Sequence, residues 1–228
     1  MFSSPIFKRI VTNGFFATLF TSLIKLTSFF KVSFIIGTYT AFFSMTSIMM
    51  PLSGSFGGIS GALAVGALGL GLRLFLVGFI SFTHLAYHIP GLFAALYWTT
   101  RSPLIRIVLP LTCMLAFIAH PVGQIAWCYS LYWLIPVGLY LFKGKSLNNL
   151  FFEALGSTFI AHAVGSVIWI YAMPMTPQVW LALMPVVIVE RLVFASGMVL
   201  MHKVISYAIS MWKSRVSLFQ AFFVSHKN

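Results

Sequence analysis

Runs of mostly apolar residues follow one another along almost the whole of this chain, separated by short connections that hold Pro, Gly or basic residues. An α-helix needs about 20 such residues to cross the hydrocarbon core of a bilayer. The runs of spanning length are 32–50, 56–72, 103–119, 122–142, 147–171 and 178–201. We therefore predict an all-α integral membrane protein built as a bundle of six transmembrane helices.

The composition excludes a water-soluble fold. Hydrophobic residue types make up 60% of the chain, charged types only 7%, and the mean hydropathy is +1.00. Such a chain cannot cover a water-facing surface with polar side chains, and it is far too apolar for a disordered tail. The formal charge of +12 comes from 14 Lys and Arg against 2 acids, so acids are scarce rather than bases abundant. We expect membrane lipid around most of the chain and no nucleic-acid partner.

The remaining segments complete the predicted organisation. Residues 1–31 carry several basic groups and are expected to form an interfacial amphipathic helix. Residues 32–203 form the bundle, and residues 204–228 a basic cytoplasmic tail. Within the bundle, residues 74–100 are apolar but contain the sequence His88-Ile-Pro-Gly91, which predicts a broken or re-entrant helix. Irregular backbone at membrane depth is tolerated where it is buried in protein or lines a wet cavity.

The distribution of Lys and Arg predicts the orientation in the membrane, because short cytoplasmic loops are enriched in both. The connections 51–55, 120–121 and 172–177 contain neither residue type. If residues 74–100 start and end on the same face of the membrane, every basic group except Arg191 lies on the side of the membrane that holds both termini. We therefore expect a multi-pass protein of the cell (inner) membrane with both termini in the cytoplasm.

Polar and ring side chains inside the predicted spans are the candidate site, because an ionisable group at membrane depth is costly without a partner or a role. The adjacent residues Glu190 and Arg191 diverge by about 100° on a helix, so each is expected to find a partner elsewhere. We predict an apolar pocket in which rings stack a flat solute and a few polar groups set specificity. Its predicted residues are Trp127, Trp133, His162, Trp169, Glu190 and Arg191. Lipid-facing or packed rings, and an ion pair that only fixes the bundle, are the alternatives.

No metal or cofactor site is predicted. His84 and His88 have the i, i+4 spacing that can hold one ion from a helix, but no acid lies near them in the sequence. Cys113 and Cys128 lie in apolar runs, where a thiol usually behaves as a small hydrophobe. Glu153 is expected to act as an acid near a helix N-terminus, which the helix dipole favours.

Two short elements are similar to those of rhomboid intramembrane serine proteases. They are Gly58-Ile59-Ser60-Gly61 and Ala161-His162-Ala163-Val164-Gly165, which resemble the family's Gly-x-Ser-Gly and Ala-His-x-x-Gly. That resemblance implies Ser60 as nucleophile and His162 as its base. In rhomboids about one helix separates the two elements, whereas several predicted segments do so here. An intramembrane protease is therefore an alternative, and we do not predict an enzyme.

The body of the chain, about residues 30–203, resembles the substrate-binding S-components of energy-coupling-factor transporters in size, six predicted spans, cytoplasmic termini and few soluble loops. The resemblance implies a small-molecule solute, a transmembrane scaffold subunit and ATPase subunits as partners. It also implies that Gly37 and Ala41, spaced by four, contact the scaffold. The implied gating loop contains Pro51, Gly54, Gly57 and Gly58.

From this resemblance we predict the solute-binding subunit of a vitamin-like micronutrient importer. The chain has no Gly-x-x-x-x-Gly-Lys-Ser/Thr sequence, so we expect its partners to bind ATP. A non-catalytic membrane scaffold protein is the remaining alternative.

Overall fold

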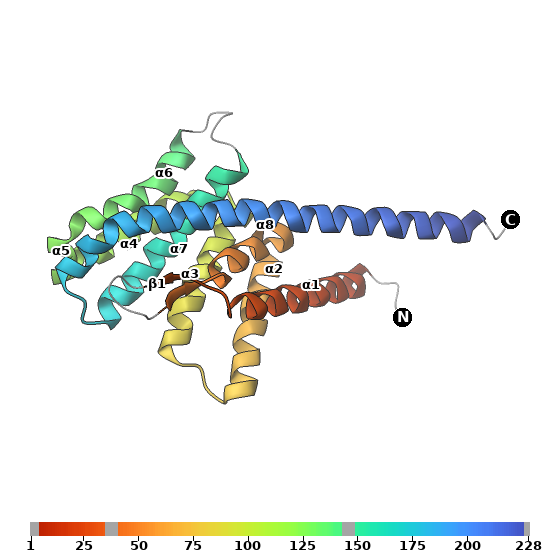
Figure 1. Cartoon of the computed structure of the whole chain (residues 1–228), viewed down its shortest axis with the longest axis horizontal. Helices are drawn as coiled ribbons and strands as arrows, with labels where there is room; N and C mark the ends of the chain where they lie inside the picture. Colours follow the sequence, from red (N-terminus) through yellow and green to blue (C-terminus); the bar gives the residue numbers. More distant parts are fainter. Residues whose placement is uncertain (1–4, 35–40, 143–148, 226–228) are drawn as a thin grey trace.

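The structure is a computed structural model that describes residues 5–34, 41–142 and 149–225, and this part of the chain is almost entirely helical (Figure 1). A two-stranded antiparallel hairpin accompanies the helices. The all-α class is therefore confirmed. In chain order the elements are α1 (Pro5–Thr27), β1 (Lys31–Phe34), β2 (Ala41–Ser44), α2 (Thr46–Val77), α3 (Phe82–Thr99), the π-helical turn η1 (Leu104–Val108), α4 (Leu109–Ala119), α5 (Pro121–Ile125), the 3-10 helix η2 (Trp127–Trp133), α6 (Leu134–Leu141), α7 (Leu150–Ala172) and α8 (Pro177–Ser225).

Three of the described helices are long and apolar enough to cross a membrane, namely Thr46–Val77, Leu150–Ala172 and the Pro177–Trp212 part of α8. Six spans are not confirmed, because the other apolar runs are divided into shorter helices. Proline has no N–H and its ring clashes with the preceding turn, so it favours the start of a helix over its interior. The run 103–119 accordingly forms η1 and α4, and the run 122–142 forms α5, η2 and α6.

The predicted span 32–50 is wrong over its described part. Strands β1 and β2 pair antiparallel there, and α2 begins only at Thr46. The sequence from Lys31 to Ser44 is rich in Val, Ile, Thr, Tyr and Phe, which fit an extended backbone better than a helix. Ala41 therefore lies in strand β2, whereas Gly37, the other residue predicted to contact a partner helix, lies outside the described residues.

The predicted gating loop lies inside helix α2. Pro51 and Gly54 are buried, and the Gly54 backbone lies against the Ala95 carbonyl of α3 so closely that a β-carbon would overlap it. This close contact of two helices stabilises the helical form despite Pro51. Gly57 is also helical, and the chain bends only at Gly58, whose φ of 62° and ψ of −162° suit glycine alone. The first part of α2 and the part after Gly58 therefore run in different directions (Figure 1).

Helix α3 is continuous from Phe82 to Thr99, so the break predicted at His88-Ile-Pro-Gly91 is wrong. Pro90 is buried and packs against α7 at Gly165, where even a β-carbon would make only ordinary van der Waals contact with the proline ring. The packing against Gly165 offsets the hydrogen bond that proline cannot donate. Helix α3 begins at Ser81, whose hydroxyl accepts a hydrogen bond from the His84 N–H at 3.2 Å.

Helix α7 is the central element and contacts α3, α4, α6 and α8. One buried apolar cluster joins α1, α2 and α8, and a second joins α4, η2, α7 and α8. Helix α1 confirms the helix predicted near the N-terminus, but in its described part exposed Phe15 and Leu26 lie opposite the buried Phe20 and Ile24, so the outer face is not polar. Helix α8 continues without a break through the predicted boundary at residue 203 and extends well beyond the bundle (Figure 1).

Candidate functional site

Three predicted or neighbouring ring residues meet inside the bundle. The Trp133 indole of η2 donates a hydrogen bond to Nδ1 of His162 on α7 at 3.0 Å. The Tyr129 hydroxyl, one helical turn earlier on η2, lies 2.8 Å from Nε2 of the same imidazole. Both ring nitrogens of His162 therefore have a partner. Because Trp133 only donates, His162 carries its proton on Nε2 when neutral and donates to the Tyr129 oxygen.

This group, which we call the Trp–His–Tyr cluster (Tyr129, Trp133 and His162), is closely packed. The three side chains are 3%, 0% and 8% exposed. Phe117 of α4 meets Trp133 edge to face at 5.3 Å, and Trp180 of α8 meets Tyr129 at 5.0 Å, both between ring centroids. Edge-to-face pairs at these distances are favourable. Rings from three elements, η2, α4 and α8, thus pack together beside His162 of α7.

Glu190 and Arg191 of α8 lie close to the Trp–His–Tyr cluster. Arg191 Nη2 is 3.2 Å from Glu190 Oε2, and Nη1 donates to the Thr158 carbonyl of α7 at 3.4 Å. The expectation that these adjacent residues find their partners elsewhere is wrong for this pair, because the two charged groups still approach to 3.2 Å. Thr158 lies one helical turn before His162 on α7, so its contact with Arg191 places the guanidinium beside the cluster. The bundle therefore brings together Trp133, His162, Glu190 and Arg191 of the predicted pocket.

Two of the predicted pocket residues lie elsewhere. Trp127, at the start of η2, is 52% exposed. Trp169 on α7 is half-buried and meets Tyr87 of α3 edge to face at 5.5 Å. The helical spacing of His162, Ser166 and Trp169 places them along one face of α7, but Trp169 lies two turns from His162 and contacts a different helix.

The residues of the alternative protease dyad are not hydrogen-bonded to each other. Ser60 is exposed on α2, two residues after the bend at Gly58. His162 is buried on α7, and its two nitrogens are engaged by Tyr129 and Trp133. A serine nucleophile needs its base within hydrogen-bonding distance.

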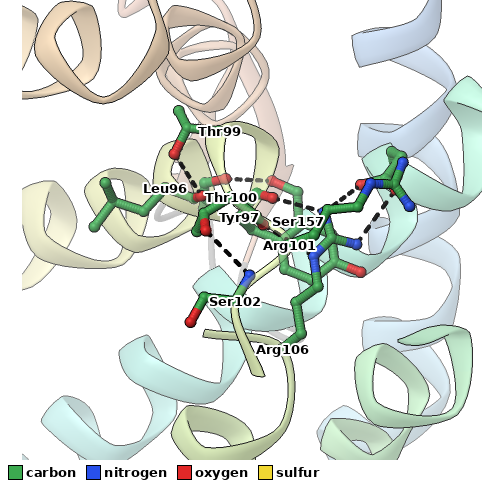
Figure 2. A network of polar contacts seen from close by, with 10 residues as sticks. Leu96, Tyr97, Thr99, Thr100, Arg101, Ser102, Arg106 and Ser157 are labelled. Atoms are coloured by element: carbon green, nitrogen blue, oxygen red, sulfur yellow. Dashed lines mark hydrogen bonds and ion pairs between the residues drawn. The ribbon is translucent and has the colours of Figure 1, made fainter. Parts of the chain in front are cut away.

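A second polar group, which we call the Arg–Glu junction (Arg101, Arg106 and Glu153), joins the end of α3 to the start of α7 (Figure 2). Arg106 of η1 is buried and donates to both oxygens of Glu153, at 3.3 and 2.8 Å. Arg101, half exposed, approaches the same carboxylate at 3.1 Å. Glu153 lies in the first turn of α7, closer to the helix N-terminus than the predicted span 147–171 places it.

The Arg106 guanidinium makes two further hydrogen bonds. Its Nε donates to the Thr100 carbonyl at 3.0 Å and Nη2 donates to the Tyr97 carbonyl at 2.9 Å. The charged carbon lies 4.0 Å above the Tyr97 ring, a cation–π contact. In the same network (Figure 2), the Ser157 hydroxyl of α7 donates to the Ala94 carbonyl of α3 at 2.9 Å. The sequence contains no local sign of this group, because Arg106 and Glu153 are far apart along the chain.

The hollow on the surface between α3 and α7 is open and apolar. It has a volume of about 570 Å³ and is lined by Phe82, Val167, Ile168, Tyr171 and Ala172. None of the predicted pocket residues lines it. Within the described residues, no group of three or more His, Cys, Asp or Glu lies together as a metal site.

Comparisons with known protein families, with curated proteins and with solved structures found no match to this chain. The functional assignment therefore depends on the residues and geometry described above.

Proposed function

We propose that this protein is a membrane-embedded, solute-binding protein whose site is the Trp–His–Tyr cluster together with Glu190 and Arg191. The observation that carries the proposal is the convergence of Trp133 and Tyr129 on both nitrogens of His162 inside the bundle. Polar side chains at such a depth are costly, and in membrane proteins they commonly mark solute or ion sites. The rings offer faces for stacking and the polar atoms offer hydrogen bonds.

The unliganded site is closed in this proposal. His162 has two partners from η2, which is a short 3-10 helix between α5 and α6 rather than part of a long helix. A 3-10 stretch inside a longer helical path often marks a hinge. When a solute enters, movement of η2 would free the His162 nitrogens and expose the Trp133 ring. The Glu190–Arg191 pair then supplies charge of either sign at the edge of the site.

The wider role follows from the resemblance to S-components. In that role the protein is a multi-pass subunit of the cell membrane with cytoplasmic termini that captures a vitamin-like solute. A transmembrane scaffold subunit and ATPase subunits would complete the importer. The length and apolarity of three described helices support the membrane location on which this role depends.

A non-catalytic membrane scaffold is the second candidate, and α8 favours it. The helix has 49 residues, about 73 Å at 1.5 Å per residue, against a hydrocarbon core of about 30 Å. Its C-terminal part therefore projects beyond the bundle (Figure 1), where it is available to contact another protein. In this case the Trp–His–Tyr cluster and the Glu190–Arg191 pair only fix the packing of η2, α7 and α8.

The two candidates differ in what accompanies the purified protein. The experiment is to purify the full chain from its host membrane, release bound small molecules by denaturation and identify them by mass spectrometry. Trp133→Phe removes one hydrogen bond of the cluster, and His162→Gln replaces the imidazole that makes both. Trp127→Phe, which changes an exposed ring on the same 3-10 helix, is the matched control.

We expect one compound to accompany the wild-type and Trp127→Phe proteins and to be depleted at least several-fold in the two cluster variants. Gel filtration would show that each variant stays monodisperse. Absence of any retained compound from the wild-type protein, or equal retention by all four proteins, would refute the solute site and leave the scaffold candidate.

A further inference from the structure

We propose that Arg73, His84 and His88 at the α2–α3 hairpin, with Lys25 of α1 beside them, bind the phosphate group of an anionic phospholipid. The α2–α3 hairpin consists of the part of α2 after Gly58, the connection at residues 78–81, and α3. It projects from the rest of the molecule at the bottom of Figure 1. This site is distinct from the Trp–His–Tyr cluster, so the proposal does not depend on the proposed solute site.

The three side chains lie together near the tip of the hairpin. His84 and His88 are one turn apart on α3, and their rings stack with centroids 5.4 Å apart. The His88 ring lies against Gly69 of α2, where a β-carbon would come within 3.0 Å of it. Arg73 follows Gly69 by one turn on α2, and its charge and that of Lys25 both act on His84. Two helices and the end of α1 thus contribute to one group.

This group has hydrogen-bond donors in excess of acceptors. Arg73 Nε, His84 Nε2 and His88 Nε2 are shielded from solvent and have no hydrogen-bond partner among the described residues. A buried polar atom that lacks a partner is destabilising. An anion with several oxygens would accept hydrogen bonds from Arg73 Nε and from Nε2 of His84. The His88 ring also bonds the Gly66 backbone, so His88 donates to the anion when its ring is protonated, because a neutral imidazole donates from one nitrogen only.

No acidic side chain takes this place. The sequence has only two acidic residues. Glu153 is bound by Arg101 and Arg106, and Glu190 pairs with Arg191. Both lie on other helices, α7 and α8. The anion that balances Arg73 and Lys25 must therefore come from outside the chain. The same positive surroundings disfavour a metal cation between the two histidines.

The surroundings of the group indicate that this anion belongs to a lipid. Exposed apolar side chains encircle the hairpin tip, namely Leu74, Phe75, Leu76, Phe79 and Phe82. Phe75 is 86% exposed, which is unfavourable in water and favourable among acyl chains. Basic side chains flanked by exposed apolar groups are the arrangement with which proteins bind at the level of anionic headgroups. A free phosphate ester has no part that would use this apolar rim.

The test measures the binding of phosphatidylglycerol to the purified full-length protein by native mass spectrometry, with phosphatidylcholine as the uncharged comparison. The variants are Arg73→Gln and the double change His84→Gln and His88→Gln. Lys203→Gln, which removes an exposed charge on α8 far along the chain, is the matched control. Gel filtration and circular dichroism check that each variant is folded.

We expect the wild-type protein to bind phosphatidylglycerol more tightly than phosphatidylcholine. Arg73→Gln should weaken phosphatidylglycerol binding roughly fivefold, because this is the usual contribution of one basic side chain at an anionic membrane surface. The double histidine change should weaken binding by a similar factor, and Lys203→Gln less than twofold. Equal binding of both lipids by the wild-type protein would overturn the proposal. Equal affinity of the wild-type protein and all variants for phosphatidylglycerol would also overturn the proposal.

A competition arm separates the two sources of phosphate. Soluble glycerophosphoglycerol has the same phosphodiester group as phosphatidylglycerol without acyl chains. We expect it to displace phosphatidylglycerol only at much higher concentration. Displacement at equal concentration would overturn the lipid assignment and identify the ligand as a free phosphate ester.

Discussion

Replacement of Glu153 by Gln tests whether the Arg–Glu junction holds the start of α7 against the end of α3. The change keeps the shape of the side chain and removes its charge. The Arg106 side chain is only 4% exposed, so its charge is left in a buried position without a counter-ion. Removal of one partner from a buried ion pair typically costs about 3–5 kcal/mol of stability.

The surroundings of Arg106 place the expected loss at the lower end of this range. Its Nε and Nη2 retain the Thr100 and Tyr97 carbonyls as acceptors, at 3.0 and 2.9 Å. The Tyr97 ring also remains 4.0 Å from the charge. We therefore expect Glu153→Gln to lower the free energy of unfolding by about 3 kcal/mol. This loss corresponds to more than a hundredfold change in the unfolding equilibrium.

Arg101→Gln is the matched control, because it removes the other partner of the same carboxylate. The Arg101 side chain is 53% exposed, and solvent-exposed ion pairs contribute about 0–1 kcal/mol. A third variant, Arg106→Met with Glu153→Leu, removes both buried charges together. Since an apolar replacement of a buried pair is often neutral, we expect the double variant to be more stable than Glu153→Gln alone.

The assay is equilibrium unfolding of the purified protein in detergent, followed by tryptophan fluorescence and circular dichroism. The reasoning would be refuted if Glu153→Gln lost no more stability than Arg101→Gln. It would also be refuted if the double variant were less stable than Glu153→Gln, because the buried charge would then not be the cause of the loss.

The other predictions concern helix contacts and use the same unfolding assay. Gly54→Ala should destabilise the protein by more than about 1 kcal/mol, because the new methyl group overlaps the Ala95 carbonyl. Gly71→Ala on the same helix meets no atom within 4 Å and should be neutral or stabilising by about 0.5–1 kcal/mol. Similar losses of stability in both variants would contradict the close contact of Gly54 with Ala95. Asn149→Ala should lower the free energy of unfolding by about 1 kcal/mol, because the Asn149 side chain caps α7 by accepting a hydrogen bond from the Phe152 N–H at 3.0 Å. Asn149→Asp should keep most of that stability, because a carboxylate accepts the same hydrogen bond. Ser157→Ala should lower the free energy of unfolding by about 1 kcal/mol, because it removes the 2.9 Å hydrogen bond to the Ala94 carbonyl. An unchanged midpoint of the unfolding transition would show that this bond does not stabilise the α3–α7 contact.

Local patterns in the sequence were sufficient for the class of fold. Composition and the length of the apolar runs predicted an all-α protein with membrane-spanning helices, and they placed α7 and most of the apolar part of α8 within a few residues. The sequence also predicted Glu153 as an acid near the N-terminus of this helix, although the structure places it in the first turn, nearer that end than the predicted span did. These features depend on near neighbours and on the solvent, both of which the sequence shows directly.

Local patterns misplaced the structure near residues 32–58 and at Pro90. Proline and glycine there indicated a loop and a broken helix, yet Pro51, Gly54 and Pro90 lie within helices. A helix tolerates proline where contacts with another helix offset the missing hydrogen bond. Those contacts, Gly54 with Ala95 and Pro90 with Gly165, come from residues far apart along the chain.

The polar groups show the same division between sequence and tertiary structure. The sequence alone determined that the few ionisable and ring residues inside the apolar runs would need partners, because lipid does not solvate them. Only the folded bundle decided which partners they have: Trp133 with His162, Arg106 with Glu153, and Arg191 with its neighbour Glu190. Partner choice depends on distances between side chains on different helices and on their rotamers, which the spacing of residues along one helix does not specify.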